Sequence, residues 1–224
     1  TKLQEHNNAM LYEQFKDRIG ELAIGEVHHI RHKHVILLDD EGNEYILPKE
    51  NQIPSDFFRK GDNVRAIIET VDFEGSKPQI IVSRTAPKFL EKLLELEIPE
   101  IQDGTIILKK VVRIPGEKAK IAVDAYDDRI DPVGACVGVK GSRIHGVVRE
   151  LKNENIDVIQ WSKNPEILVR RALGNITINK GEINENDTYA LVYTPVEEIS
   201  KVIGKQGQNI RLASWLSGYE IDVY

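Results

Sequence analysis

The sequence contains a single cysteine, a single methionine and only two tryptophans in 224 residues. One cysteine cannot form an internal disulfide, so a disulfide framework is excluded and a reducing, cytoplasmic location is expected. No apolar run approaches the roughly 18 residues of a membrane span, so no membrane association is expected. The chain starts with Thr1 rather than Met, which favours a longer parent protein.

The charge balance excludes a protein that coats nucleic acid without specificity. The net charge is −6 at pH 7, with 30 Lys and Arg against 36 Asp and Glu. The excess of acid lies in residues 1–86 and 166–224, whereas residues 87–165 are balanced. Any site for nucleic acid must therefore be a local patch between acidic surfaces.

The first third of the chain has the pattern of a small β-barrel. Residues 3–19 show helical spacing of apolar residues, and they are followed by five short strand-like segments within residues 20–86. Polar turns with Gly, Asp and Asn separate these segments. Five short strands with such turns predict a small closed barrel.

The rest of the chain repeats one supersecondary unit. Residues 87–163 and 164–224 each have the order helix, strand, strand, helix, Gly-x-x-Gly, helix, strand. Asp131, Asn164 and Thr194 each precede a proline and are expected to cap a helix. The fold class is therefore multidomain, a β-barrel followed by two α+β units.

Each repeat contains a Gly-x-x-Gly frame with a lysine inside, GVKG at 138–141 and GKQG at 204–207. About one such frame is expected by chance in a chain with 16 glycines, so a lone copy would mean little. A lone frame would most simply be a helix C-cap. The matched surroundings raise the pair above chance and point to a shared function.

A turn of this kind between two helices suits phosphate. Glycines let a ligand approach the backbone, and the next helix begins there with free N–H groups and the positive end of its dipole. Lys140 and Arg143 add charge at the first loop, as do Lys205 and Arg211 at the second. A nucleotide-cleaving P-loop is disfavoured, because neither frame ends in Gly-Lys-Ser/Thr.

The stretches "IDPVGACVGVKGSRIHGVVRELKNENIDVIQWSKNP" and "IGKQGQNIRLASWLSGYEIDV" closely resemble the two tandem KH (K homology) domains of the NusA family of bacterial transcription elongation and termination factors. "GDNVRAIIETVD" and "IIVSR" resemble that family's OB-fold domain of the ribosomal-protein-S-one type. The resemblance implies an OB-fold barrel at 20–86 and prokaryotic-type α-β-β-α-α-β KH domains at 87–163 and 164–224.

The same resemblance implies a non-catalytic regulator. No cofactor or metal is expected, and the lack of a Gly/Ser linker between the two repeats favours a rigid monomer. It implies binding of nascent single-stranded RNA and effects on pausing, termination and antitermination, together with RNA polymerase and other antitermination factors as partners. Residues 1–19 would be the last helix of an otherwise missing N-terminal domain, through which polymerase would mainly bind. The residues that it implies for RNA are Gly138, Val139, Lys140, Gly141, Ser142, Arg143, Gly204, Lys205, Gln206, Gly207, Gln208, Asn209 and Arg211.

Other candidate residues carry weaker signals. Four histidines in "VHHIRHKH", residues 27–34, invite a metal site, but a turn at 31–33 would scatter them, so a solvated barrel rim is favoured. His34 and Arg84 are the barrel residues that we expect to contact RNA by stacking or through phosphate. Cys136 is expected to be a small buried packing residue.

Two other functions stay open at this point. The chain could be the RNA-binding appendage of a nuclease or phosphorylase, although such enzymes more often carry one KH unit before the barrel. It could also be a protein-interaction scaffold whose loops are only structural. Carboxylates form no paired constellation with a supporting motif, so no catalytic machinery is predicted.

Overall fold

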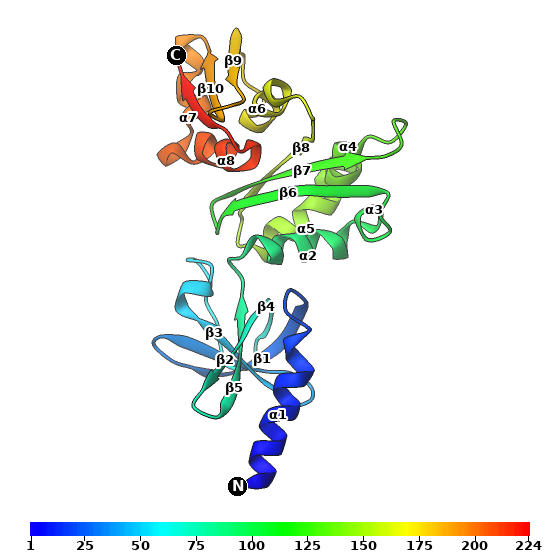
Figure 1. The fold of residues 1–224 in the computed structure, drawn as a ribbon, viewed down its shortest axis with the longest axis vertical. Coiled ribbons are helices and arrows are strands. Elements are labelled where there is room, and N and C mark those ends of the chain that lie inside the picture. The colour runs from blue at the N-terminus through cyan, green and yellow to red at the C-terminus, as the bar shows by residue number, and fades with distance from the viewer. The chain divides into compact units, whose positions relative to one another are not determined.

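The computed structural model describes residues 1–224, which divide into two compact units, residues 1–93 and 94–224 (Figure 1). No helix is both long and apolar enough to cross a membrane.

The first unit is a closed five-stranded barrel with a helix against it. Its elements are α1 Lys2–Lys16, β1 Leu22–Ile30, β2 His34–Leu38, β3 Glu44–Pro48, β4 Asn63–Glu74 and β5 Lys77–Ser83. The strand order is β1-β2-β3-β5-β4, and β4 pairs with β1 to close the ring. This is an OB-like barrel, as the sequence predicted.

Apolar side chains at alternate strand positions fill the barrel. Val35 and Leu37 of β2, for example, are buried and their neighbours are less so. Helix α1 joins this core through Phe15, which is fully buried with its ring 6.0 Å from the ring of Tyr45. The amide of Asn8 also donates to the carbonyl of Ser76 at 3.1 Å, so the helix is part of this unit's packing.

The two α+β repeats follow. We call residues from α2 to β8 the first repeat, with α2 Pro87–Glu97, α3 Pro99–Gln102, β6 Ile106–Ile114, β7 Lys118–Ala125, α4 Pro132–Val137, α5 Ser142–Glu150 and β8 Asn155–Gln160. The second repeat has α6 Pro165–Leu173, β9 Lys180–Asn184, β10 Tyr189–Tyr193, α7 Ile199–Ile203, α8 Gln208–Ser217 and β11 Glu220–Val223.

Both repeats have the same sheet topology. The first sheet has the order β6-β7-β8 and the second β9-β10-β11, and in each the last two strands are parallel. The predicted order of elements is confirmed in both repeats.

Two of the three expected helix caps form. Asp131 accepts from the Gly134 N–H at 3.1 Å, and Asn164 accepts from the Glu166 N–H at 3.0 Å. The prediction for Thr194 is wrong, because its hydroxyl donates to the carbonyl of Thr177 at 2.6 Å and α7 begins only at Ile199. The hydroxyl thus bonds the segment before β9 instead of capping a helix.

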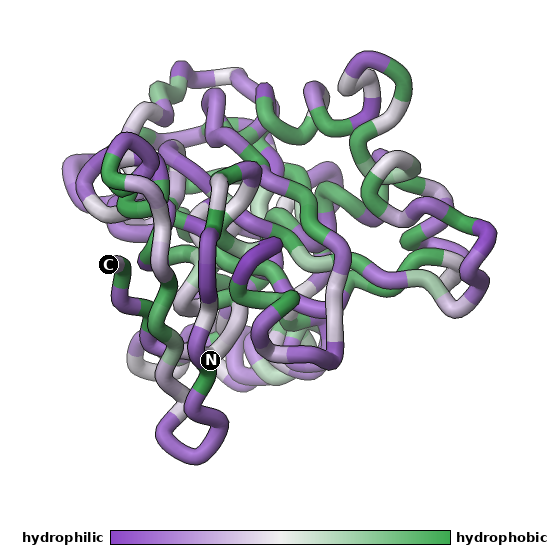
Figure 2. Tube along the Cα trace, turned by 90° about the horizontal axis from the view of Figure 1, so that it is seen from above, coloured by the Kyte–Doolittle hydropathy of each residue, from purple (hydrophilic) through white to green (hydrophobic).

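The two repeats share one apolar core within the second unit. Helix α8 packs against β6 and β7, and Val112, Ala122 and Ile159 of the first repeat join the cluster that contains Leu212 and Leu216 of α8. Figure 2 shows the corresponding alternation of hydrophobic and hydrophilic residues along the chain, with hydrophilic residues at many projecting turns. The second repeat is therefore seated on the sheet of the first.

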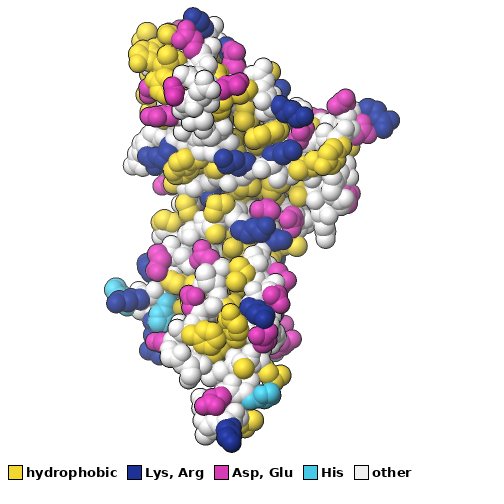
Figure 3. Space-filling view, viewed as in Figure 1, with side chains coloured by type: hydrophobic (Ala, Val, Ile, Leu, Met, Phe, Trp, Pro, Cys, Tyr) yellow, Lys and Arg dark blue, Asp and Glu magenta, His cyan; other side chains and the backbone are white.

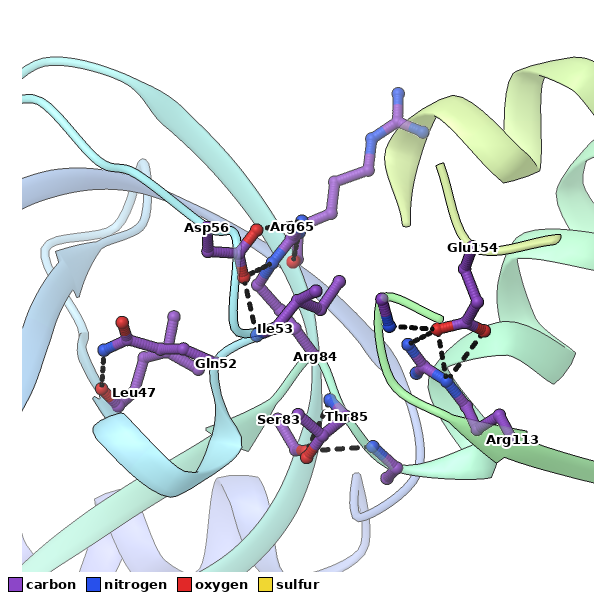
Figure 4. Close-up of polar contacts among 12 residues, drawn as sticks. Leu47, Gln52, Ile53, Asp56, Arg65, Ser83, Arg84, Thr85, Arg113 and Glu154 are labelled. Carbon is purple, nitrogen blue, oxygen red and sulfur yellow. Dashed lines mark hydrogen bonds and ion pairs between the residues drawn. The ribbon is translucent and has the colours of Figure 1, made fainter. Parts of the chain in front are cut away.

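A buried ion pair fixes the β6–β7 turn of the first repeat (Figure 4). Arg113 and Glu154 have no exposed side-chain surface, and their closest nitrogen and oxygen are 2.8 Å apart. The Gly116 N–H donates to the same carboxylate at 2.7 Å. Several hydrogen bonds offset the cost of burying the two charges, and they tie β6 to the segment before β8.

Candidate nucleic-acid interface

The two Gly-x-x-Gly loops have nearly the same backbone. Each loop links a short helix (α4 or α7) to a longer one (α5 or α8) and places its last two residues at positive φ. The matched φ and ψ angles are 78° and 173° at Gly138 against 77° and 175° at Gly204, 54° and 32° at Lys140 against 54° and 27° at Gln206, and 75° and 15° at Gly141 against 72° and 13° at Gly207.

The first glycine of each loop is required by the fold itself. A Cβ at Gly138 would lie 2.9 Å from Cγ of Arg143, and one at Gly204 would lie 2.7 Å from Cβ of Asn209. Real Cβ atoms do not approach so closely, so the start of the next helix excludes any side chain there. The last glycine differs between the loops: a Cβ at Gly207 would meet only Nη2 of Arg211, at 3.9 Å, whereas one at Gly141 would lie 2.9 Å from the ring of His145.

The side chains between the glycines face solvent. Val139 is 81% exposed, Lys140 and Gln206 are exposed, and the Lys205 side chain is 72% exposed. Nζ of Lys205 lies 3.7 Å from Oε2 of Glu117, a long and exposed ion pair that costs little to break. Each loop therefore presents one exposed lysine next to the start of a helix, where the first N–H groups lie. This arrangement can hold a phosphodiester.

Arg143 mainly stabilises the first loop through internal hydrogen bonds. Its guanidinium forms two hydrogen bonds with Glu100, at 2.6 and 3.2 Å, and a third with the carbonyl of Ala135 at 2.8 Å. The hydrogen bond from Arg143 holds the pKa of the Glu100 carboxyl below its ordinary value. One third of the Arg143 side chain remains exposed, so a ligand could still reach it.

Gln208 and Asn209 lie inside the second repeat, which the sequence did not indicate. They are 7% and 4% exposed. The Asn209 amide donates to the carbonyls of Leu173 and Val202, each at 2.9 Å, and its oxygen accepts from Nζ of Lys118 at 3.3 Å. Asn209 thus fastens the second loop to α6, to α7 and to the first repeat. Arg211, in contrast, is exposed and supports the loop by donating to the carbonyl of Gln206 at 3.1 Å.

A groove of about 710 Å³ joins the repeats within the second unit. One wall is Val133 of α4 with residues 156–160 of β8, and the other is residues 173–176 with Lys201. Arg171 lies on the same groove and donates to the carbonyls of Gln160 and Trp161, at 3.1 and 3.4 Å. These lining residues could not be identified from the sequence, because they belong to no motif and only the fold brings them to the same groove.

His34 and Arg84, the two barrel residues expected to contact RNA, differ in exposure. His34 is partly exposed and lines a surface hollow with His32, Lys33 and Ile46 among others. Arg84 is 3% exposed, and its Nε donates to the buried carboxylate of Asp56 at 2.8 Å, while Nη1 donates to the carbonyl of Arg65 (Figure 4). Arg84 therefore has an internal role, because its guanidinium is engaged by Asp56 and Arg65 and is not open to RNA.

No three His, Cys, Asp or Glu side chains gather where they could hold a metal ion. His28 and His29 lie beside each other with ring centroids 4.2 Å apart, and His29 is exposed. Cys136 is fully buried, and burial raises the pKa of its thiol to about 11. Cys136 is thus the small buried packing residue that the sequence predicted. Its thiol stays protonated at neutral pH, so it is not a reactive nucleophile.

The fold and the paired loops define a tandem KH protein with an OB-like barrel. Residues 84–161 match the NusA-like first KH domain, and residues 165–224 match the NusA-like second KH domain. The chain is a NusA-like protein with two KH domains.

Three relatives, each called transcription termination/antitermination protein NusA, are similar over nearly all of the chain. The protein of Halalkalibacterium halodurans is 40% identical over 222 residues, which are 99% of this chain and 58% of the relative. That of Bacillus subtilis is 38% identical over 222 residues, covering 99% and 60%. That of Thermus thermophilus is 36% identical over 220 residues, covering 98% and 57%. The chain thus spans less than two thirds of each relative's length.

Proposed function

We propose that this protein is a non-catalytic, cytoplasmic transcription regulator that binds nascent single-stranded RNA through its two Gly-x-x-Gly loops. The observation that carries the proposal is the near identity of the two loop backbones, each with an exposed lysine beside the first turn of a helix. Two copies of one phosphate-sized frame in one unit are best explained by one ligand that both can hold.

RNA would pass from one loop to the other along the groove between the repeats. The proposed contacts are the exposed loop residues Val139, Lys140, Lys205 and Gln206, with Ser142 and Arg211 beside them. Gln208 and Asn209 would act from the interior by holding the second loop in place. His34 on the barrel is a further, weaker candidate.

The curated relatives are named for transcription termination and antitermination, and from them we infer that the RNA contact serves pausing, termination and antitermination. RNA polymerase and other antitermination factors are the proposed partners. Polymerase would bind mainly through a further N-terminal domain, and the protein would act as a monomer.

A titration with short and long single-stranded RNAs at two salt concentrations tests this function. An RNA that reaches both loops should bind far more tightly than one that reaches a single loop, because two sites held in one frame act together. The affinity should also fall with salt, as phosphate contacts require. Equal affinity for both lengths would rule out binding across both loops, and no binding at low salt would favour a protein-interaction scaffold.

A further inference from the structure

The sheet of the second repeat has one side that no other element covers. Helices α6 and α8 pack on its inner side against Ala190, Val192 and Ile221. The opposite side, which we call the outer face, is formed by alternate residues of β9, β10 and β11. Its central residues are Glu182, Tyr189, Leu191, Tyr193, Glu220 and Asp222.

The same side of the first repeat's sheet is covered by a helix. Helix α8 packs against β6 and β7 there, and Val112, Ala122 and Ile159 are buried in the shared core as a result. The two sheets have the same topology. The chain itself therefore shows that the outer side of this fold accepts a helix.

The two faces carry an aspartate at the same place. "IDV" occupies residues 156–158 in β8 and 221–223 in β11, so Asp157 and Asp222 correspond. In the first repeat two lysines of the same sheet neutralise Asp157, with Nζ of Lys120 at 2.8 Å and Nζ of Lys118 at 3.3 Å. Burial alone would raise the pKa of Asp157, but the two ammonium groups hold it below its ordinary value.

The second repeat lacks both lysines. The strand register places Leu191 beside Asp222 as it places Lys120 beside Asp157, and Tyr189 stands where the first repeat has Lys118. Asp222 accepts a hydrogen bond from the Tyr189 hydroxyl in place of an ammonium. Glu182 pairs with Lys180 at 2.7 Å, which leaves the carboxylates of Asp222 and Glu220 without an ion pair on this face.

The outer face is therefore apolar at its centre, with three carboxylates and one lysine around it. Leu191 lies between Glu182 of β9 and Asp222 of β11, whereas Tyr193 lies opposite Lys180, whose Nζ is 5.7 Å from its ring centroid. Tyr224, 63% exposed, extends the aromatic area with its ring 6.0 Å from that of Tyr193. Figure 3 shows hydrophobic side chains bordered by acidic ones over these C-terminal strands at the top of the view. Tyrosines can stack on bases, but carboxylates repel the phosphates that would come with them.

We propose that the outer face of the second repeat is a docking surface for a basic amphipathic helix of a partner protein. The apolar side of this helix would cover Leu191 and the tyrosines, as α8 covers the first repeat. Its Lys or Arg side chains would pair with Asp222 and Glu220, the two carboxylates without an ion pair. The partner would thus supply the positive charge that Lys118 and Lys120 supply within the first repeat. This surface goes beyond the RNA contact and leaves the loops free for it.

The variant Leu191→Lys tests this complementarity. It places an ammonium beside Asp222 as Lys120 lies beside Asp157, so the face would neutralise itself and lose its apolar centre. Val196→Lys is the matched control, because it adds the same charge at a residue that is 83% exposed and lies after β10, outside the outer face. Asp222→Asn removes the central charge with little change of shape, and it serves if Leu191→Lys does not fold.

Two synthetic helical peptides with the same leucine stripe serve as probes, one with lysines and one with glutamates on the polar side. We expect the lysine peptide to bind by fluorescence anisotropy and to shift amide NMR signals of β9, β10 and β11. Leu191→Lys should weaken it at least about tenfold, Asp222→Asn should weaken it measurably, and Val196→Lys should change it less than about twofold.

Several outcomes would overturn the proposal. One is equal binding of the glutamate peptide, and another is an unchanged affinity in both Leu191→Lys and Asp222→Asn. Single-stranded RNA that shifts the signals of β9 to β11 would assign the face to nucleic acid instead. A dimer in sedimentation that Leu191→Lys dissociates would show that a second copy of this chain occupies it.

Discussion

Replacing Gly207 by Asp tests the second loop with little disturbance of the fold. Gly207 has a φ of 72°, so any side chain there costs about 1 kcal/mol of folding free energy. Space is not limiting, since the nearest atom to a Cβ would be Nη2 of Arg211 at 3.9 Å. Gly204 would be a poor choice, because a Cβ there would collide with Asn209 at 2.7 Å.

The expected loss of RNA affinity comes mainly from charge. A carboxylate about 5 Å from a bound phosphate would repel it by about 1 kcal/mol in water and about 3 kcal/mol at an effective dielectric constant of about 20. The new carboxylate would also pair with Arg211 and remove its charge from the RNA. We therefore expect affinity to fall at least about tenfold, which is about 1.4 kcal/mol.

Gly207→Asn is the matched control, because it has the same strain and nearly the same shape but no charge. Fluorescence anisotropy with a labelled single-stranded RNA that reaches both loops gives the affinities, and thermal melts report folding. Both variants should melt slightly below the parent. A folded Gly207→Asp protein that binds RNA like the parent, or like Gly207→Asn, would refute the view that phosphate lies against this loop.

Three further predictions concern the loop lysines, the buried Asn209 and the Glu100–Arg143 pair. Lys140→Ala and Lys205→Ala should each weaken RNA binding modestly and lower the slope of log affinity against log salt by about one; unchanged slopes would argue against phosphate contacts. Asn209→Ala should lower the free energy of unfolding by about 2–3 kcal/mol in urea melts, since buried carbonyls lose their donor; a parent-like melt would contradict this role. The Glu100–Arg143 pair should stabilise the fold at pH values above the ordinary carboxyl pKa, and this stabilisation should disappear as the pH falls through the lowered pKa of Glu100. In thermal melts from neutral to acid pH, the melting temperature of Glu100→Gln should therefore fall less than that of the parent. An equal fall in both proteins would exclude the effect.

The sequence was sufficient to predict the loops because their cause is local. Glycines at fixed spacing, an Asp131 cap before Pro132, and helical apolar spacing after the loop all act over a few residues. The second Gly-x-x-Gly frame, 66 residues further on, supported the interpretation of the first, and the two loops have nearly the same dihedral angles. The five strands of the barrel were equally accessible, because alternation and turn chemistry mark them, but their order β1-β2-β3-β5-β4 was not predicted.

The interior roles of polar residues near the loops could not be predicted in this way. Asn209 follows the second loop directly, yet its partners Leu173 and Lys118 are 36 and 91 residues away in the chain. Arg84 pairs with Asp56 over a separation of 28 residues. A polar side chain beside a motif looks like a ligand contact until long-range packing shows that it satisfies buried groups.

The position of Asn209 also bears on how two weak sites can act as one. Its side chain is held by carbonyls at the ends of α6 and α7 and by Lys118 of the first repeat. The second loop therefore cannot shift without breaking contacts that also seat α8 on the sheet of the first repeat. Because the loops share this frame, an RNA bound at one loop would meet the other without first ordering the protein, and the second contact would cost less entropy than a free encounter. The net charge of −6 would work in the same direction, since general repulsion would weaken random binding and favour the two proposed lysine loops.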